Sequence, residues 1–176
     1  MNTDIVGTHR NQYLESDAFN VIFATFVTDG TSGPDWIDRL ERNGITLSES
    51  AKSILNSPDF IPSSGRIVDI GILRVSPHIV SEHETENICA KAEKMKWTRL
   101  NAEAACLILE KFSPDEFKRQ RLESVVAFHK PIKTAENRPS FLTATIFDAC
   151  KMLLACPDKK NGYWNFGTGI AFEICH

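Results

Sequence analysis

The sequence lacks a long hydrophobic run, a secretory signal and a strong excess of charge of either sign. Its longest apolar run, residues 18–27, covers about ten residues and is interrupted by Asn20, whereas a membrane-spanning helix needs about twenty. The first residues contain no basic segment followed by an apolar stretch, so we expect no secretory signal. These absences predict a cytoplasmic protein with no membrane partner.

The charged residues nearly balance, with 20 Lys and Arg against 23 Asp and Glu and a formal net charge of -3. A chain without a positive field has little long-range attraction for nucleic acid or an anionic membrane. The 5 cysteines are an odd number without a repeating spacing, which argues against a disulfide framework. We therefore expect free thiols and no nucleic-acid partner.

What is present suffices for one globular domain. The chain has 176 residues, of which 42% are hydrophobic and 24% are charged, and a chain of this length buries a core without disulfides or metal ions. No internal repeat or low-complexity tract divides it. We expect a single domain over residues 1–176, in which residues 1–18 form a poorly ordered N-terminal arm.

Hydrophobic periodicity predicts an alternation of strands and helices. The first expected strand has apolar side chains on both faces, which is typical of an interior strand. Residues 141–155 fit either one helix or two short strands, and periodicity does not decide between them. The expected strands are 19–27, 66–75, 124–129 and 169–175, and the expected helices are 34–42, 48–55, 84–96, 101–112 and a short one that begins at Ser113.

Together these elements predict an α+β fold. A mainly antiparallel sheet of about five or six strands is expected to pack against helices from the central third of the chain. Strand order does not follow from periodicity.

Several segments carry a resemblance to a known group of proteins. Their order and spacing resemble a set of small uncharacterised bacterial proteins with no assigned activity, and the likeness extends from about residue 28 to the C-terminus. The matching segments are Thr28-Asp29-Gly30 with Ser32, and residues 36–40, 50–53, 55–60, 102–108 and 129–132.

The resemblance implies structure but no function. It implies that residues 142–147 and 152–155 are two strands joined by a turn, where the relatives tend to have Asp and Gly. The sequence departs from the relatives at Lys130, where they usually have an acidic residue, and at Leu109, where they usually have arginine. Any charged site at these positions would be altered in this chain.

The strongest catalytic candidates lie on one helix and at the end of one strand. Glu103, Cys106 and Glu110 are spaced so that they share one face of a helix. If His129 opposed this face, a Cys-His or Glu-His pair for nucleophilic or acid-base chemistry would result. The alternative interpretation is an amphipathic helix with a buried thiol, and a histidine that hydrogen-bonds the adjoining loop.

Metal and aromatic sites have weaker support. His78, His83 and Glu84, with Cys89 nearby, do not have the spacing of a structural zinc site, so we expect neither metal nor cofactor. Exposed aromatic side chains anchor protein interfaces, so a set of aromatic residues is a candidate binding surface, with core packing as the alternative. Its members are Trp97, Tyr163 and Trp164.

The helices expected over residues 34–55 have the outline of a helix-turn-helix. Lys52 is the only cation of the second helix, and phosphate binding depends on Arg and Lys, so DNA binding is a weak alternative. No complete catalytic set is present. The sequence therefore favours a non-catalytic cytoplasmic binding or protein-interaction domain, with homodimerisation as a default, over a small enzyme that uses His129 with Cys106 or a glutamate.

Overall fold

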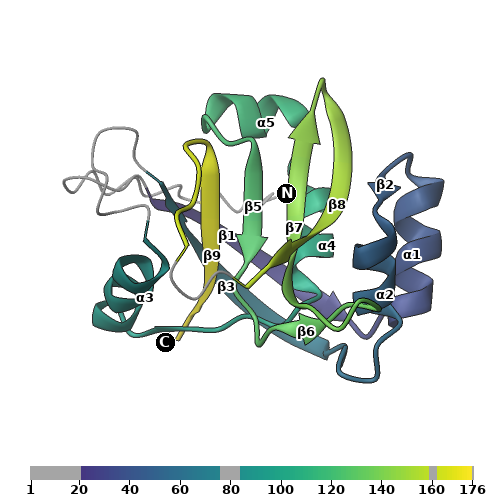
Figure 1. Cartoon of the computed structure of the whole chain (residues 1–176). Coiled ribbons are helices and arrows are strands. Elements are labelled where there is room, and N and C mark those ends of the chain that lie inside the picture. The colour runs from purple at the N-terminus through teal and green to yellow at the C-terminus, as the bar shows by residue number, and fades with distance from the viewer. Residues whose placement is uncertain (1–20, 76–83, 159–161, 176) are drawn as a thin grey trace, which may run out of the picture.

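The computed structural model describes residues 21–75, 84–158 and 162–175 (Figure 1). In this part of the chain a mixed sheet of nine strands curls into a half-barrel, accompanied by five short helices. The elements in chain order are β1 (Val21–Asp29), α1 (Gly33–Arg42), β2 (Thr46–Leu47), α2 (Glu49–Leu55), β3 (Ser64–Arg74), α3 (Thr85–Lys94), β4 (Trp97–Thr98), α4 (Ala104–Lys111), α5 (Pro114–Arg119), β5 (Ser124–Ala127), β6 (Ile132–Lys133), β7 (Pro139–Phe147), β8 (Cys150–Pro157) and β9 (Thr168–Ile174).

The prediction of a mainly antiparallel sheet of five or six strands is wrong. The strands follow the order β1-β3-β9-β5-β7-β8-β2, with β4 on β9 and β6 on β7. The β5–β9 and β2–β8 pairs are parallel, and the other pairs are antiparallel. Three of the strands have only two residues, which is too short to leave a periodic signal in the sequence.

The interpretation of the first strand as an interior strand is also wrong, because β1 lies at the edge of the sheet. Among the described residues it pairs only with β3, and Phe19 of the expected strand lies outside them. One face of β1 buries Ile22 and Phe26, while Phe23 and Val27 on the other face are 45% and 64% exposed. Apolar residues on both faces of β1 therefore do not mean burial on both faces.

Helix boundaries follow local capping chemistry. The side chains of Ser32 and Ser48 accept hydrogen bonds at the first turns of α1 and α2, and Ser113 forms a capping box with Glu116 at α5. The helix expected from residue 101 begins later, at Ala104, and the Asn101 side chain donates to the Ile61 carbonyl.

Residues 139–157 form a hairpin, which confirms two strands over one helix. β7 and β8 are antiparallel, and Phe147 pairs with Cys150. The two residues between them, Asp148 and Ala149, have φ of 47° and 63°, which is the backbone of a tight hairpin turn. Asn and Gly adopt this conformation most easily, so the turn holds Ala149 in a strained conformation.

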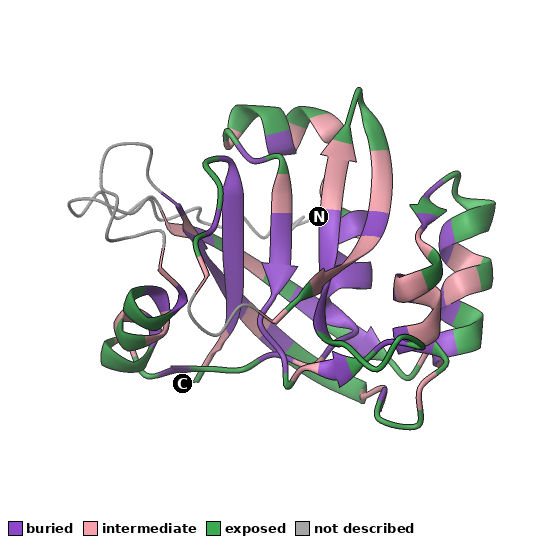
Figure 2. Cartoon of the chain, viewed as in Figure 1, coloured by how far each residue is buried: buried purple, intermediate pink, exposed green. Residues whose placement is uncertain are grey.

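Hydrophobic clusters cover both faces of the sheet. The larger one lies between the sheet and α4, with α1 and α2 beside it, and the smaller one packs α3 against the opposite face. Figure 2 shows that β9, in the middle of the sheet, is buried along most of its length. On the α3 side, Trp97 packs directly over Gly71, where an added Cβ would come within 2.4 Å of the indole ring.

No helix in the described ranges is long and apolar enough to cross a bilayer.

Candidate functional site

Glu103, at the N-terminal end of α4, is buried and structurally engaged. The residue is only 2% exposed. Its carboxylate accepts hydrogen bonds from the Ser63 backbone N–H at 3.1 Å and from the Ser63 hydroxyl. Burial raises the pKa of the Glu103 carboxyl, and the hydrogen bonds from Ser63 oppose that rise. The carboxylate therefore anchors the loop that enters β3.

Glu110, one residue from the C-terminal end of α4, is paired with an arginine. Arg39 of α1 donates from Nε and Nη2 to its two carboxylate oxygens, both at 2.6 Å. The same guanidinium binds Asp29 at 2.6 Å and stacks over Trp36, 4.6 Å from the ring centroid. Hydrogen bonds from Thr31 and Arg39 lower the pKa of Asp29 from 3.8 to about 2. This bidentate network fastens α1 to α4 and to the end of β1.

Cys106 lies between the two glutamates and is fully buried. Burial, followed by the nearby charges of Glu103 and Glu110, raises the pKa of the Cys106 thiol well above its ordinary value. Only the thiolate is a strong nucleophile. At neutral pH this cysteine is a small apolar group of the core.

His129 follows β5 and uses both ring nitrogens within the fold. Nε2 accepts from the Leu142 backbone N–H at 2.9 Å, so Nδ1 carries the proton and donates to the Lys130 carbonyl at 2.6 Å. The residue is 2% exposed, and burial lowers its pKa from 6.5 to about 4. Within the described chain no hydrogen bond or ion pair joins His129 to the three α4 candidates.

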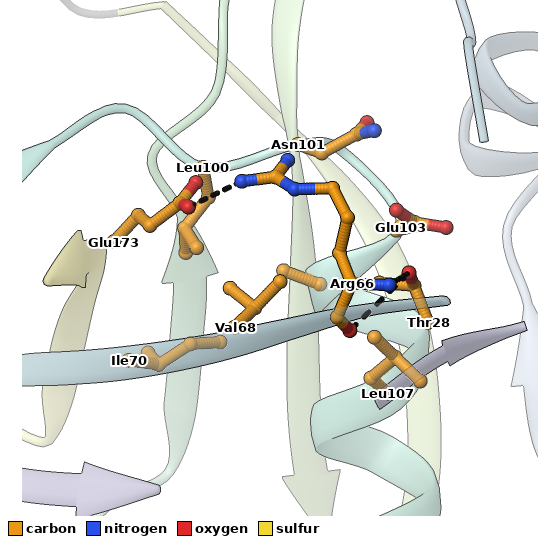
Figure 3. A pocket seen from close by; sticks show the side chains of 10 residues that line it. Thr28, Arg66, Val68, Ile70, Leu100, Asn101, Glu103, Leu107 and Glu173 are labelled. Atoms are coloured by element: carbon orange, nitrogen blue, oxygen red, sulfur yellow. Dashed lines mark hydrogen bonds and ion pairs between the residues drawn. The ribbon is translucent and has the colours of Figure 1, made fainter. Parts of the chain in front are cut away.

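A crevice beside Glu103 is too small for a substrate (Figure 3). Its volume is about 10 Å³, which accommodates one water molecule at most. The Arg66 side chain extends across it to an ion pair with Glu173 at 2.6 Å. The other residues that line it are Thr28, Val68, Ile70, Leu100, Asn101, Ala104 and Leu107.

A larger open groove lies beside residues 25–29 of β1, along the edge that has no strand partner among the described residues, and we call it the edge groove. It has a volume of about 410 Å³ and lies between β1 on one side and α1 and α4 on the other. Within the groove the Lys111 Nζ donates to the Thr25 carbonyl at 2.5 Å and lies 5.1 Å from the centroid of the Phe26 ring. The lining residues are Thr25, Phe26, Val27, Asp29, Arg39, Leu107, Glu110 and Lys111.

The three expected aromatic binding residues differ in their exposure to solvent. Trp97 and Trp164 are buried, and the Trp164 Nε1–H donates to the Thr85 hydroxyl at 2.9 Å. Tyr163 is 54% exposed, and its hydroxyl donates to Glu84 at 3.0 Å. The tryptophans serve the core, and only Tyr163 presents a ring to solvent.

Three exposed apolar side chains share one face of β1 and β3, and we call them the outer patch: Phe23, Val27 and Ile67. The hydrogen-bonded pair Thr25 and Asp69 lies between Phe23 and the other two. Val27 and Ile67 face each other across β1 and β3, and Ile67 is 72% exposed. Phe23 meets the edge of Trp97, with ring centroids 6.2 Å apart. The alternation of the β1 side chains predicts a common face for Phe23 and Val27, but the sequence does not reveal that this face is uncovered.

The remaining predicted sites gain no support from the fold. His78 and His83 lie outside the described residues, and the described ranges contain no group of three or more His, Cys, Asp or Glu side chains able to hold a metal ion. Lys52, the cation of the expected DNA-reading helix, is paired with Glu41 at 2.8 Å.

Comparison of the chain with protein-family models, with curated proteins and with solved structures finds no match. The resemblance to small bacterial proteins therefore stays a prediction from sequence, and functional inference rests on the geometry of the chain itself.

Proposed function

We propose that this protein is a non-catalytic, cytoplasmic interaction domain that binds a protein partner through the outer patch. The observation that carries the proposal is the exposure of Val27 and Ile67, which are 64% and 72% exposed and lie directly opposite each other. Neighbouring apolar side chains gain free energy when a partner removes them from water. Phe23 adds an aromatic side chain of the kind that anchors interfaces.

The state of the candidate catalytic residues supports the non-catalytic part of the proposal. A nucleophilic cysteine must ionise, and burial keeps the Cys106 thiol protonated. A general base needs an accessible nitrogen, and main-chain groups occupy both nitrogens of His129. The crevice beside Glu103 has no room for a substrate.

Site-specific photo-cross-linking in the producing cell tests the proposal. A benzophenone amino acid placed at Val27 or Ile67 is expected to form a discrete adduct with one partner protein. Phe147 offers a matched control, because it is 67% exposed and lies on β7, which three strands separate from β1. The same photo-reactive residue at Phe147 is expected to give no such adduct.

The partner identified by mass spectrometry is then purified and titrated against three variants. Val27→Asp and Ile67→Asp are expected to weaken binding at least roughly tenfold, since each places a charge in an apolar contact, while Phe147→Asp leaves the affinity unchanged. Equal adducts from all three positions, or equal affinities for all three variants, would contradict the proposal.

A further inference from the structure

The edge of β1 that has no strand partner in the described part of the chain is well suited to strand pairing. β1 has 9 residues, contains no proline, and carries its only charged residue, Asp29, at its end. Edge strands of this length are normally protected by proline, charged residues or a covering element, because their unpaired main-chain groups bind other strands. Within the described chain, the Thr25 carbonyl in the middle of β1 is protected by one side chain, because the Lys111 Nζ donates a hydrogen bond to it.

The edge groove provides room for an added strand. Its volume of about 410 Å³ falls within the range of pockets that hold ligands. One wall is β1 itself, and the other wall is formed by side chains of α1 and α4. An extended segment in this groove would meet main-chain groups on one side and side chains on the other, which is how β-augmentation combines affinity with specificity.

The charges of the groove identify the chemistry of its occupant. Asp29 and Glu110 are both held by Arg39 at 2.6 Å. Lys111 is different, because its partners in the described chain are a main-chain carbonyl and the face of the Phe26 ring, not a carboxylate. One positive charge in the groove is therefore available for an acidic group.

We propose that the edge groove binds an extended peptide segment of a partner protein that pairs with β1 and places an acidic side chain at Lys111. The inference rests on the proposed interaction function and adds the conformation and charge of the ligand. On binding, Lys111 exchanges the Thr25 carbonyl for the carboxylate of the peptide, and the freed carbonyl accepts a main-chain N–H. A second copy of the chain fits less well, because two β1 strands paired about Thr25 would bring two Lys111 side chains together.

Two fluorescein-labelled nonapeptides serve as probes. Both alternate threonine and valine, and they differ only at the central residue, which is glutamate in one and lysine in the other. Fluorescence anisotropy is expected to give at least roughly tenfold tighter binding of the glutamate peptide to the full chain. Amide hydrogen exchange along Val21–Asp29 is expected to slow when this peptide is bound.

Lys111 variants test the charge. Lys111→Met is expected to remove the preference between the two peptides, and Lys111→Glu to reverse it. Lys133→Met, at an exposed position on β6, removes an equal charge elsewhere and is expected to keep the preference. Unfolding midpoints of all three variants establish that the comparison is made between folded proteins.

Three outcomes would overturn the inference: no binding of either peptide, an equal preference in Lys111→Met and wild type, or unchanged exchange along β1. A dimer in light scattering, with β1 amides already protected without peptide, would make a second copy the occupant and also reject it. Loss of the cellular partner in Ile67→Asp, a position in the outer patch that does not line the edge groove, together with any of these outcomes, would reject the strand-pairing model and leave the proposed function standing.

Discussion

The region around α4 and the outer patch differ in which side chains they expose. Around α4 the ionisable side chains are engaged within the fold, whereas in the outer patch apolar side chains face solvent. Along α4 and its N-cap lie the ionisable side chains Glu103, Cys106 and Glu110, and each is hydrogen-bonded, ion-paired or desolvated. The outer patch contains Phe23 and Val27, apolar side chains that remain in contact with water. The reactive residues thus stabilise the fold, whereas the unreactive ones are available for recognition.

This difference leads to opposite expectations for mutation. A buried polar group leaves its partner unsatisfied when it is removed, so its loss is costly. An exposed apolar side chain has few contacts to lose, so its replacement changes stability little. Five measurements test the contrast, from the largest expected effect to the smallest.

The largest effect is expected for His129→Ala. The substitution removes a buried ring and leaves the Leu142 N–H without its acceptor, so the free energy of unfolding should fall by about 3 to 5 kcal/mol. Urea denaturation at pH 7 measures the change. A loss below about 1 kcal/mol would mean that His129 is not a structural member of the interior.

The protonation of His129 predicts a dependence on pH. Its pKa is lowered from 6.5 to about 4 in the fold, so the unfolded chain binds the proton more readily between these values. Stability should therefore decrease as pH falls from about 6.5 to about 4, by up to about 3 kcal/mol. The difference between wild type and His129→Gln isolates this contribution, and a flat difference across this range would contradict the assignment.

A smaller effect is expected at Glu103, where two variants separate hydrogen bonding from charge. Glu103→Ala leaves two Ser63 donors without an acceptor and should cost about 2 kcal/mol. Glu103→Gln keeps an acceptor and removes a buried charge, so its stability should match or exceed that of wild type at pH 7.

The pH dependence at Glu103 has the opposite sign from that at His129. Because burial raises the pKa of the Glu103 carboxyl, its stabilising contribution is present below the unfolded pKa of about 4.3 and is lost as pH rises. Any advantage of Glu103→Gln in thermal or urea unfolding should therefore shrink between pH 7 and pH 4. A larger advantage at pH 4 would reject the raised pKa.

The smallest effect on stability is expected in the outer patch. Val27→Thr and Ile67→Thr replace exposed apolar groups and should each change the free energy of unfolding by less than about 0.5 kcal/mol. Affinity for the cross-linked partner, measured by calorimetry, should nevertheless fall. Destabilisation of more than about 2 kcal/mol would indicate that the patch belongs to the core and would remove the contrast.

Local chemistry was predictable from sequence, and long-range pairing was not. The helix starts expected near residues 34, 48 and 113 depend on neighbouring residues and are confirmed, with Ser32, Ser48 and Ser113 as the N-caps. The edge position of β1 and the parallel β5–β9 pair depend on contacts between distant segments, which periodicity does not encode.

The same distinction applies to the candidate site. Helical spacing brought Glu103, Cys106 and Glu110 together correctly, because they share α4 and its N-cap. Their partners Ser63 and Arg39 lie 40 and 71 residues away in sequence. The partners decide whether a carboxylate is free or engaged, so spacing identified the residues without revealing their roles.

The central position of β9 has a consequence for synthesis of the protein. β9 joins β3 on one side and β5 on the other, yet it is the last strand that the ribosome produces among those described. Until Thr168–Ile174 has been translated and has left the exit tunnel, β1–β3 and the β5–β7–β8 segment have no strand to connect them. In the nascent chain the edges of β3 and β5 therefore stay without their partner strand until β9 pairs with both of them.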